Sequence, residues 1–282
     1  MTTSFRLGYV DDPARCVRGW IDPPSPSAPR RRSCVIVLHG FKGFAHWGFF
    51  PAIAKALAED GHTVVRFNAS GAGVGEDPLV MDDDAGFEAN TISREVEDLE
   101  RVRAWVTKDS GLDVDAARFG FLGHSMGGGV GLVHAREHER AWAALVTWAA
   151  VGTFARASEA MLARWRDDGF AIFPNGRTGQ EHRLGLGFVH DIERQPQRFD
   201  LIAAARSLNV PSLLLHGAQD ESVPPSEVEP MRAALVEPAR FELHPGAGHT
   251  FGAVHPLQPE REWPDEMQWL FTRTRGHFAD VL

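Results

Sequence analysis

The apolar and polar positions of this chain follow two patterns that alternate along its length. Short runs that are mostly apolar, such as residues 33–38 and 144–149, are typical of strands buried on both faces of a sheet. Longer stretches repeat apolar residues at helical spacing, as in residues 91–108, which end shortly before Gly111. This alternation predicts an α/β fold in which a mostly parallel central sheet is covered by helices on both faces.

The same patterns locate the other elements of this core. Two short alternating runs near the N-terminus, residues 4–10 and 16–21, are split by Asp11-Asp12-Pro13, which favours a hairpin. Three aspartates at residues 82–84 predict an exposed acidic turn. The further strands are expected at residues 64–67, 118–122, 212–215 and 239–243, and the further helices at residues 49–60, 128–135, 201–207, 226–236 and 264–281.

Residues 152–198 interrupt this alternation. They contain one helical stretch, two short β pieces and a turn, at residues 154–165, 170–173, 184–189 and 174–176. Long segments of this kind inside a compact domain are commonly lids or binding elements. We therefore predict a core of residues 1–151 and 199–282 with an inserted cap at residues 152–198. The alternative is an ordinary crossover connection that has grown long.

The motif Gly123-His124-Ser125-Met126-Gly127 lies between a predicted buried strand and a predicted helix of small residues. In that setting a Gly-x-Ser-x-Gly motif indicates a nucleophile elbow, a sharp turn that holds the serine hydroxyl beyond the end of the strand. Gly123 and Gly127 would allow the strand and helix backbones to approach closely. A glycine-rich packing loop is the alternative interpretation.

A serine hydroxyl needs a base to accept its proton, and that base needs a third group to fix its tautomer. Asp220 and His249 each follow a predicted strand, so both should lie at the same edge of the sheet as Ser125. Their order, Ser then Asp then His, is that of the α/β-hydrolase triad. Alternatively, Asp220 caps the helix that follows it and His249 lies in a surface loop.

A tetrahedral intermediate carries an oxyanion, which needs two hydrogen-bond donors already in place. We expect these donors to be the backbone amides of Met126, directly after the serine, and of Phe41, in the loop that follows residues 33–38. Three other histidines near strand ends, His39, His124 and His216, are flanked by glycine and are expected to make structural hydrogen bonds.

Composition narrows the possible partners. The 282-residue chain has 38 acidic and 29 basic residues and a net charge of −9, which argues against nucleic acid or an anionic membrane surface. The N-terminus lacks the apolar stretch of a signal peptide, so we expect a cytoplasmic protein. Cys16 and Cys34 have no metal-binding spacing and are expected to be reduced, although they could face each other on adjacent strands.

The glycine-rich loop at residues 70–76 does not fit a dinucleotide-binding site. Its third glycine comes one residue too early for Gly-x-Gly-x-x-Gly, and no helix follows at once. We interpret it as a flexible loop that borders the site.

Taken together, His39-Gly40-Phe41, the serine motif, His216-Gly217-x-x-Asp220 and Gly248-His249 look like the α/β-hydrolase superfamily. The histidine loop and the late cap resemble its dienelactone-hydrolase-like, acylaminoacyl-peptidase-like and feruloyl-esterase-like branch. Ser125 departs from dienelactone hydrolases proper, whose nucleophile is a cysteine. The resemblance implies a hydrolase that forms an acyl-enzyme without a metal or an organic cofactor.

We therefore predict a serine hydrolase that cleaves carboxylic esters of a small-molecule acyl substrate. Amide, acyl-peptide or thioester hydrolysis, or acyl transfer, would use the same machinery, and a ligand-binding module without catalysis is a further alternative. The motifs do not indicate an oligomeric state. Residues expected to line an apolar substrate pocket, some of which could instead belong to the core, are Phe44, Trp47, Trp165, Phe170, Phe173 and Phe188.

Overall fold

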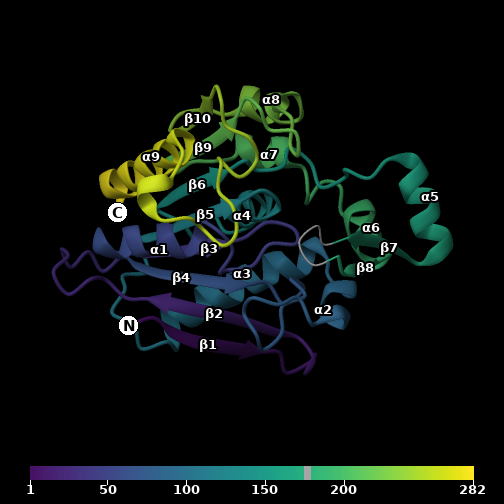
Figure 1. The fold of residues 1–282 in the computed structure, drawn as a ribbon, viewed down its shortest axis with the longest axis horizontal. Helices are drawn as coiled ribbons and strands as arrows, with labels where there is room; N and C mark the ends of the chain where they lie inside the picture. Colours follow the sequence, from purple (N-terminus) through teal and green to yellow (C-terminus); the bar gives the residue numbers. More distant parts are fainter. Residues whose placement is uncertain (175–178) are drawn as a thin grey trace.

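The computed structural model describes residues 1–174 and 179–282. Its centre is an eight-stranded sheet with the strand order β1-β2-β4-β3-β5-β6-β9-β10 (Figure 1). The strands are β1 Thr3–Gly8, β2 Cys16–Asp22, β3 Cys34–Leu38, β4 Thr63–Asn68, β5 Phe119–His124, β6 Ala144–Trp148, β9 Ser212–Gly217 and β10 Ala239–His244.

The direction of the strands confirms the predicted fold class. β1 and β2 form an antiparallel hairpin, and β2 also pairs antiparallel with β4. Every other neighbouring pair in this sheet is parallel. The carboxyl ends of β3, β5, β9 and β10 therefore lie at one edge, where ligands bind in sheets of this kind.

Helices cover both faces of the sheet because successive residues of each strand point to opposite sides. In β3, Val35 and Val37 belong to the same apolar cluster as the helices α1 and α9. Ile36 and Leu38 belong to the cluster on the other face, with α3, α4, α7 and α8. These helices are α1 Phe50–Glu59, α3 Ile92–Lys108, α4 Met126–Glu137, α7 Leu201–Arg206, α8 Pro225–Ala234 and α9 Asp265–Val281. A short 3-10 helix, η1, spans Glu260–Glu262.

The predicted acidic turn at residues 82–84 is wrong in part, because it begins a short helix, α2 Asp84–Glu88. The side chain of Asp83 accepts a hydrogen bond from the Gly86 amide and so caps this helix. The N-terminus of α3 is capped in the same way by Thr91, which accepts from the amide of Arg94.

Segment 152–198 lies to one side of the main sheet (Figure 1). It contains α5 Glu159–Asp168, an antiparallel pair of strands, β7 Phe170–Pro174 and β8 Glu181–Gly185, and α6 Gly187–Arg194. The expected β piece at residues 184–189 is therefore wrong beyond Gly185, because an amphipathic turn of helix begins at Gly187. The turn expected at Pro174-Asn175-Gly176 lies partly outside the described residues.

Several contacts attach segment 152–198 to the core, among them the following three. The Nδ1 atom of His182 lies 3.0 Å from a carboxylate oxygen of Asp84. The carboxylate of Asp191 accepts hydrogen bonds from the amide and the hydroxyl of Ser93, at 2.8 and 2.7 Å. Lys42, in the loop after β3, donates to the carbonyl of Pro174 at 3.0 Å. Separate parts of the segment are thus each attached to the core beside the predicted site.

The glycine-rich loop after β4 is buried from Ser70 to Val74. The carboxylate of Asp98 in α3 accepts hydrogen bonds from the amide and the hydroxyl of Ser70, at 2.7 and 2.8 Å. Arg15 donates to the other oxygen of Asp98 at 2.9 Å, so this buried charge is paired.

The two cysteines do not lie on adjacent strands. Cys16 begins β2 and Cys34 begins β3, and β4 lies between these strands. Both thiols are free. Within the described part of the chain, no helix combines the length and the apolar character needed to cross a membrane.

A buried acid in α3 makes the stability of the fold depend on pH. Burial raises the pKa of Glu95 to about 8, against the lowering effect of a hydrogen bond from Asn90, and the nearby charge of Asp98 raises it further. The folded chain therefore binds one more proton than the unfolded chain between the ordinary pKa of 4.5 and about 8. As the pH rises through this window, the free energy of unfolding therefore decreases.

We predict that Glu95→Gln removes this dependence. The free energy of unfolding of the wild type should fall by about 3 kcal/mol more between pH 5 and pH 8 than that of the variant. Urea denaturation at the two pH values measures the difference, and the exposed Glu88→Gln in α2 is the matched control. Equal pH dependence in wild type and Glu95→Gln would show that Glu95 is ionised in the folded chain.

Candidate active site

Ser125 occupies a strained turn between β5 and α4. Its backbone dihedrals, φ 55° and ψ −120°, lie outside the regions that L-residues ordinarily adopt. The neighbouring glycines make this turn possible. A Cβ atom at Gly123 would lie 2.6 Å from the carbonyl oxygen of Gly127, and one at Gly127 would lie 2.2 Å from the carbonyl oxygen of His39. The strand-turn-helix arrangement expected of an elbow is present.

The structure brings Ser125, His249 and Asp220 together at the carboxyl edge of the sheet, although they are far apart in the sequence. The Nε2 atom of His249 lies 3.1 Å from the hydroxyl oxygen of Ser125. Its Nδ1 atom lies 2.8 Å from Oδ2 of Asp220. Because an ionised carboxylate can only accept, Nδ1 carries the proton and Nε2 is free to accept the hydroxyl proton of Ser125.

Asp220 is held in a fixed orientation by its own loop. Its Oδ1 atom accepts hydrogen bonds from the amides of Ser222 and Val223, at 2.9 and 2.8 Å, while Oδ2 faces His249. Burial by itself would raise the pKa of Asp220. The hydrogen bonds from His249 and Val223 and the adjacent imidazoles outweigh that effect and hold the pKa below its ordinary value. The carboxylate is therefore ionised at neutral pH.

The three other histidines near strand ends make hydrogen bonds to the backbone. His39 lies 2.8 Å from the carbonyl of Gly40, and His216 lies 2.8 Å from that of Val223. The Nε2 atom of His124 lies 3.1 Å from the carbonyl of His249, which fixes the loop that carries the third triad candidate. Burial lowers the pKa of His39 to about 4 and that of His124 to about 3, so both are neutral at physiological pH.

The loop after β3 passes directly beside the serine. A Cβ atom at Gly40 would lie 2.8 Å from the Cβ of Ser125, so only glycine fits there without displacement. Phe41 and Met126 both border the same cavity as Ser125. Among the described residues, neither the Phe41 amide nor the Met126 amide donates a backbone hydrogen bond. Met126 is the first residue of α4, a position at which the backbone N–H has no acceptor within the helix.

We predict that Gly40→Ala lowers kcat by about 100-fold, because moving a positioning loop by about 1 Å has an effect of that size. The added methyl group must push the loop away from Ser125, and the amide of Phe41 moves with it. Steady-state kinetics measures the loss. Gly276→Ala in α9, where a Cβ atom meets nothing within 4 Å, is the control and should leave kcat unchanged. Full activity in Gly40→Ala would show that the position of this loop does not affect the reaction.

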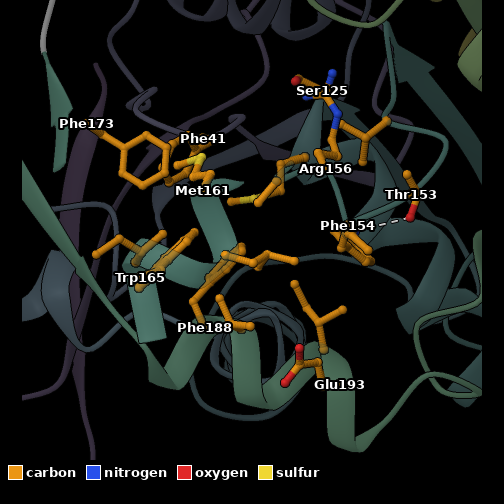
Figure 2. A pocket seen from close by; sticks show the side chains of 18 residues that line it. Phe41, Ser125, Thr153, Phe154, Arg156, Met161, Trp165, Phe173, Phe188 and Glu193 are labelled. Carbon is orange, nitrogen blue, oxygen red and sulfur yellow. Dashed lines mark hydrogen bonds between the residues drawn. The ribbon is translucent and has the colours of Figure 1, made fainter. Parts of the chain in front are cut away.

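A cavity of about 230 Å³ opens from Ser125 toward segment 152–198 (Figure 2). Of the aromatic residues expected to line it, Trp165, Phe173 and Phe188 do so. The sequence did not single out several other lining residues, although their helical spacing in α5 and α6 gave a signal that could have identified some of them. These residues are Val151, Phe154, Met161, Leu162, Leu184, Val189 and Ile192.

Three of the expected pocket residues do not line this cavity, and each packs elsewhere. Phe44 is fully buried in an apolar cluster, and its ring meets that of His255 edge-on. The ring of Trp47 packs edge-on against Phe49. Phe170 lies under the guanidinium of Arg183, at 4.5 Å. From the sequence alone, an apolar residue that packs in the core cannot be distinguished from one that lines a cavity.

One group of possible metal ligands lies away from this site. Side-chain ligand atoms of Glu100, His134 and His138 lie within 4.8 Å of one another. However, the indole N–H of Trp142 donates to Nδ1 of His134, at 3.0 Å. The proton of His134 is then on Nε2, which donates to Glu100 at 3.0 Å, so neither ring nitrogen is free to bind a metal. The donor set does not fit a metal ion.

Comparison with known proteins identifies the family. The sequence profile of the family described as serine aminopeptidase, S33, matches residues 29–172, which is just over half of the chain. The chain belongs to the serine aminopeptidase S33 family. This S33 protein is therefore a hydrolase of the α/β-hydrolase superfamily, as the motifs indicated.

Two bacterial relatives of this S33 hydrolase are provisionally named as carboxymethylenebutenolidases. The protein from Escherichia coli (strain K12) is 39% identical over 74 residues, which cover 23% of this chain and 27% of that protein. The protein from Salmonella typhimurium is 36% identical over a match of the same extent. The chain thus spans about a quarter of the length of the curated relatives it matches. These relatives agree with the dienelactone-hydrolase-like branch.

Solved structures share the fold over nearly the whole chain. Est1E from Butyrivibrio proteoclasticus has a TM-score of 0.67 at 16% identity, over 99% of this chain and 98% of that one. The same protein with bound ferulic acid has a TM-score of 0.69 at 17% identity, over 95% and 96%. The α/β-hydrolase GrgF from Penicillium sp. sh18 has a TM-score of 0.69 at 19% identity, over 100% and 99%. At these identities the likeness concerns the fold.

Proposed function

We propose that this protein is a serine hydrolase that cleaves carboxylic esters through an acyl-enzyme intermediate, with Ser125, His249 and Asp220 as its catalytic residues. The observation that carries the proposal is the continuous chain of hydrogen bonds from Asp220 through His249 to Ser125, with the serine at the wall of an apolar cavity. Proton transfer requires donor and acceptor atoms at this kind of separation.

In the first step, the hydroxyl oxygen of Ser125 attacks the carbonyl carbon of the ester while Nε2 of His249 accepts the hydroxyl proton. Asp220 stabilises the resulting imidazolium and keeps its orientation. The amides of Phe41 and Met126, two residues that border the cavity beside Ser125, would donate to the oxyanion. His249 then returns the proton to the leaving alcohol. A water molecule, activated by the same histidine, releases the acid.

Segment 152–198 would act as a cap in this reaction. Its side chains form one wall of the cavity, and Phe41, Ser125 and Met126 of the core lie on the other side. A wall of apolar side chains excludes water from the acyl group and strengthens the hydrogen bonds to the oxyanion. The cap would therefore contribute to substrate choice as well as to catalysis.

The cavity favours an ester over a peptide with a free amino terminus. Such a peptide carries a positive charge that a carboxylate must balance. Among the described residues, Glu193 is the one acidic residue that lines the cavity, and it forms an ion pair with Arg166. The names of the curated relatives point to a lactone, a cyclic ester, and the ferulic acid bound to Est1E is an aromatic carboxylic acid.

A panel of substrates that share one acyl group tests this proposal. Activity toward the p-nitrophenyl ester, the thioester and the anilide of one acid should be highest for the ester. A fluorophosphonate probe should add one label per chain, located on Ser125 by peptide mass analysis. Labelling of another residue, or ester turnover without any label, would contradict the serine mechanism. Amide, thioester and acyl-transfer reactions remain alternatives on the same residues, and the cytoplasmic location stays a prediction.

A further inference from the structure

We infer that the natural substrates carry an uncharged, apolar acyl group of about nine non-hydrogen atoms, either an arylalkanoyl group or a straight chain of about eight carbons, that extends from Ser125 toward α6. This inference rests on the proposed ester hydrolysis and adds to it the class of acyl group. Four features of the cavity support it: its polar side chains, its volume, its direction and its aromatic wall.

The two charged side chains and the one hydroxyl of the cavity other than Ser125 already have partners within the protein. Arg156 pairs with Glu227 at 3.1 Å and also donates to the carbonyl of Ser222. Glu193 pairs with Arg166. The hydroxyl of Thr153 accepts from the amide of Ala155 at 3.1 Å. The remaining lining residues apart from Ser125 are apolar, except that the indole N–H of Trp165 is buried and has no hydrogen-bond partner among the described residues. A charged acyl group would lose its hydration here without gaining a free partner of opposite charge.

The volume of the cavity sets the size of the acyl group. A cavity of about 150 Å³ lined by apolar side chains is known to hold a benzene ring, which has six non-hydrogen atoms. By proportion, the 230 Å³ found here holds about nine such atoms. A 3-phenylpropanoyl or an octanoyl group fits this limit. A hexadecanoyl chain exceeds it and would have to leave half of its length outside.

The cavity also has a direction (Figure 2). Ser125 lies at one end and Glu193 at the opposite end, while Trp165 and Phe173 lie along one side and Phe154 along the other. An acyl group attached to Ser125 can therefore run along this axis. Its far end would reach α6, where Glu193 is paired with Arg166 at the protein surface.

Aromatic rings from the core and the cap form a continuous wall along this axis. The ring of Phe41 meets that of Phe173 edge-on, with centroids 5.0 Å apart. Trp165 meets Phe173 at 5.7 Å and stacks parallel to Phe188 at 6.2 Å, with an angle of 5° between their planes. Rings that support one another in this way offer a firm apolar surface to a flat ring or an extended chain.

The test measures kcat/KM for p-nitrophenyl esters with straight acyl chains of two to sixteen carbons, together with the 3-phenylpropanoate. We expect kcat/KM to rise about fourfold for each added methylene that is buried, up to about eight carbons, and to fall beyond ten. The p-nitrophenyl half-ester of octanedioic acid, which ends in a carboxylate, should react at least about tenfold more slowly than the octanoate.

Two variants test whether the acyl group binds in this cavity. Val189→Phe fills part of the cavity from α6 and should lower kcat/KM for the octanoate by about 50-fold, equivalent to the loss of about three buried methylenes, while the acetate changes less than about twofold. Leu162→Phe, at a half-buried position in α5, should give the same selective loss if Val189→Phe folds poorly. Ile172→Phe, an exposed position in β7 outside the cavity, is the matched control.

Several results would overturn this inference while leaving the proposed function intact. They are a flat chain-length profile that still depends on Ser125, a maximum at sixteen carbons, faster reaction of the carboxylate-ending ester, or equal loss of acetate and octanoate activity in both cavity variants. Preference for octyl acetate over methyl octanoate would likewise overturn it, because the long chain would then belong to the alcohol and the alcohol would occupy the cavity. Failure of every ester to react with dependence on Ser125 would instead refute the proposed function and with it this inference.

Discussion

Replacing Ser125 with alanine is expected to lower kcat for a p-nitrophenyl ester by about 10⁶-fold, the loss typical of removing a serine nucleophile. Without the hydroxyl, no acyl-enzyme can form, and His249 has no proton to accept from this side chain. The remaining activity would come from water attacking an ester held by the cavity and the oxyanion donors. Steady-state kinetics on purified protein, corrected for spontaneous hydrolysis, measures the change.

Two controls make the Ser125→Ala result specific. Ser27→Ala removes the same atom from an exposed position between β2 and β3, so it should keep the activity of the wild type. The thermal unfolding temperature of Ser125→Ala should be no lower than that of the wild type, because alanine leaves the elbow glycines in place. Substantial Ser125-independent turnover would mean that another group attacks the ester.

Replacing Asp220 with asparagine should lower kcat by about 10⁴-fold, because the histidine would then adopt the wrong tautomer. The carboxamide can keep its oxygen toward the amides of Ser222 and Val223, which leaves its NH₂ group facing Nδ1 of His249. Nδ1 must then accept, so Nε2 carries the proton and can no longer take one from Ser125. The loop geometry and KM should change little.

Glu221→Gln provides the matched control for this second prediction. It removes a carboxylate from the next residue along the same loop, where the side chain is exposed. Its kcat should stay within about twofold of the wild type, since exposed charges at this distance have small effects. If Asp220→Asn kept most of its activity, His249 would be oriented by another group and the proposed role of Asp220 would be refuted.

The fold and the triad candidates were accessible from the sequence because the signals that encode them are local. Runs of apolar residues identify buried strands regardless of what packs on them, and the strand-Gly-x-Ser-x-Gly-helix pattern identifies an elbow from consecutive residues. Asp220 and His249 were placed by a simple rule, that loops after parallel strands open at one edge. The observed distances of 2.8 and 3.1 Å agree with that expectation.

The cavity was less accessible, because it depends on which way each side chain points. Phe44 and Phe173 are both phenylalanines in apolar surroundings, yet one is fully buried in an apolar cluster and the other lines the cavity. The helix α6 was missed for a related reason. Gly185 and Gly187 interrupt the apolar pattern in this stretch. The amphipathic character of the helix can be recognised only once the structure shows that one of its faces packs over the cavity.

The sequence by itself determined the strands of the central sheet and the helices that cover its faces, the strained turn at Ser125 and the three residue types that could share a proton, since each follows from short stretches of chain. Only the tertiary structure decided which apolar side chains surround the substrate and which polar groups are already paired. Those properties arise from contacts between distant segments, and close packing fixes them through shape rather than through residue type.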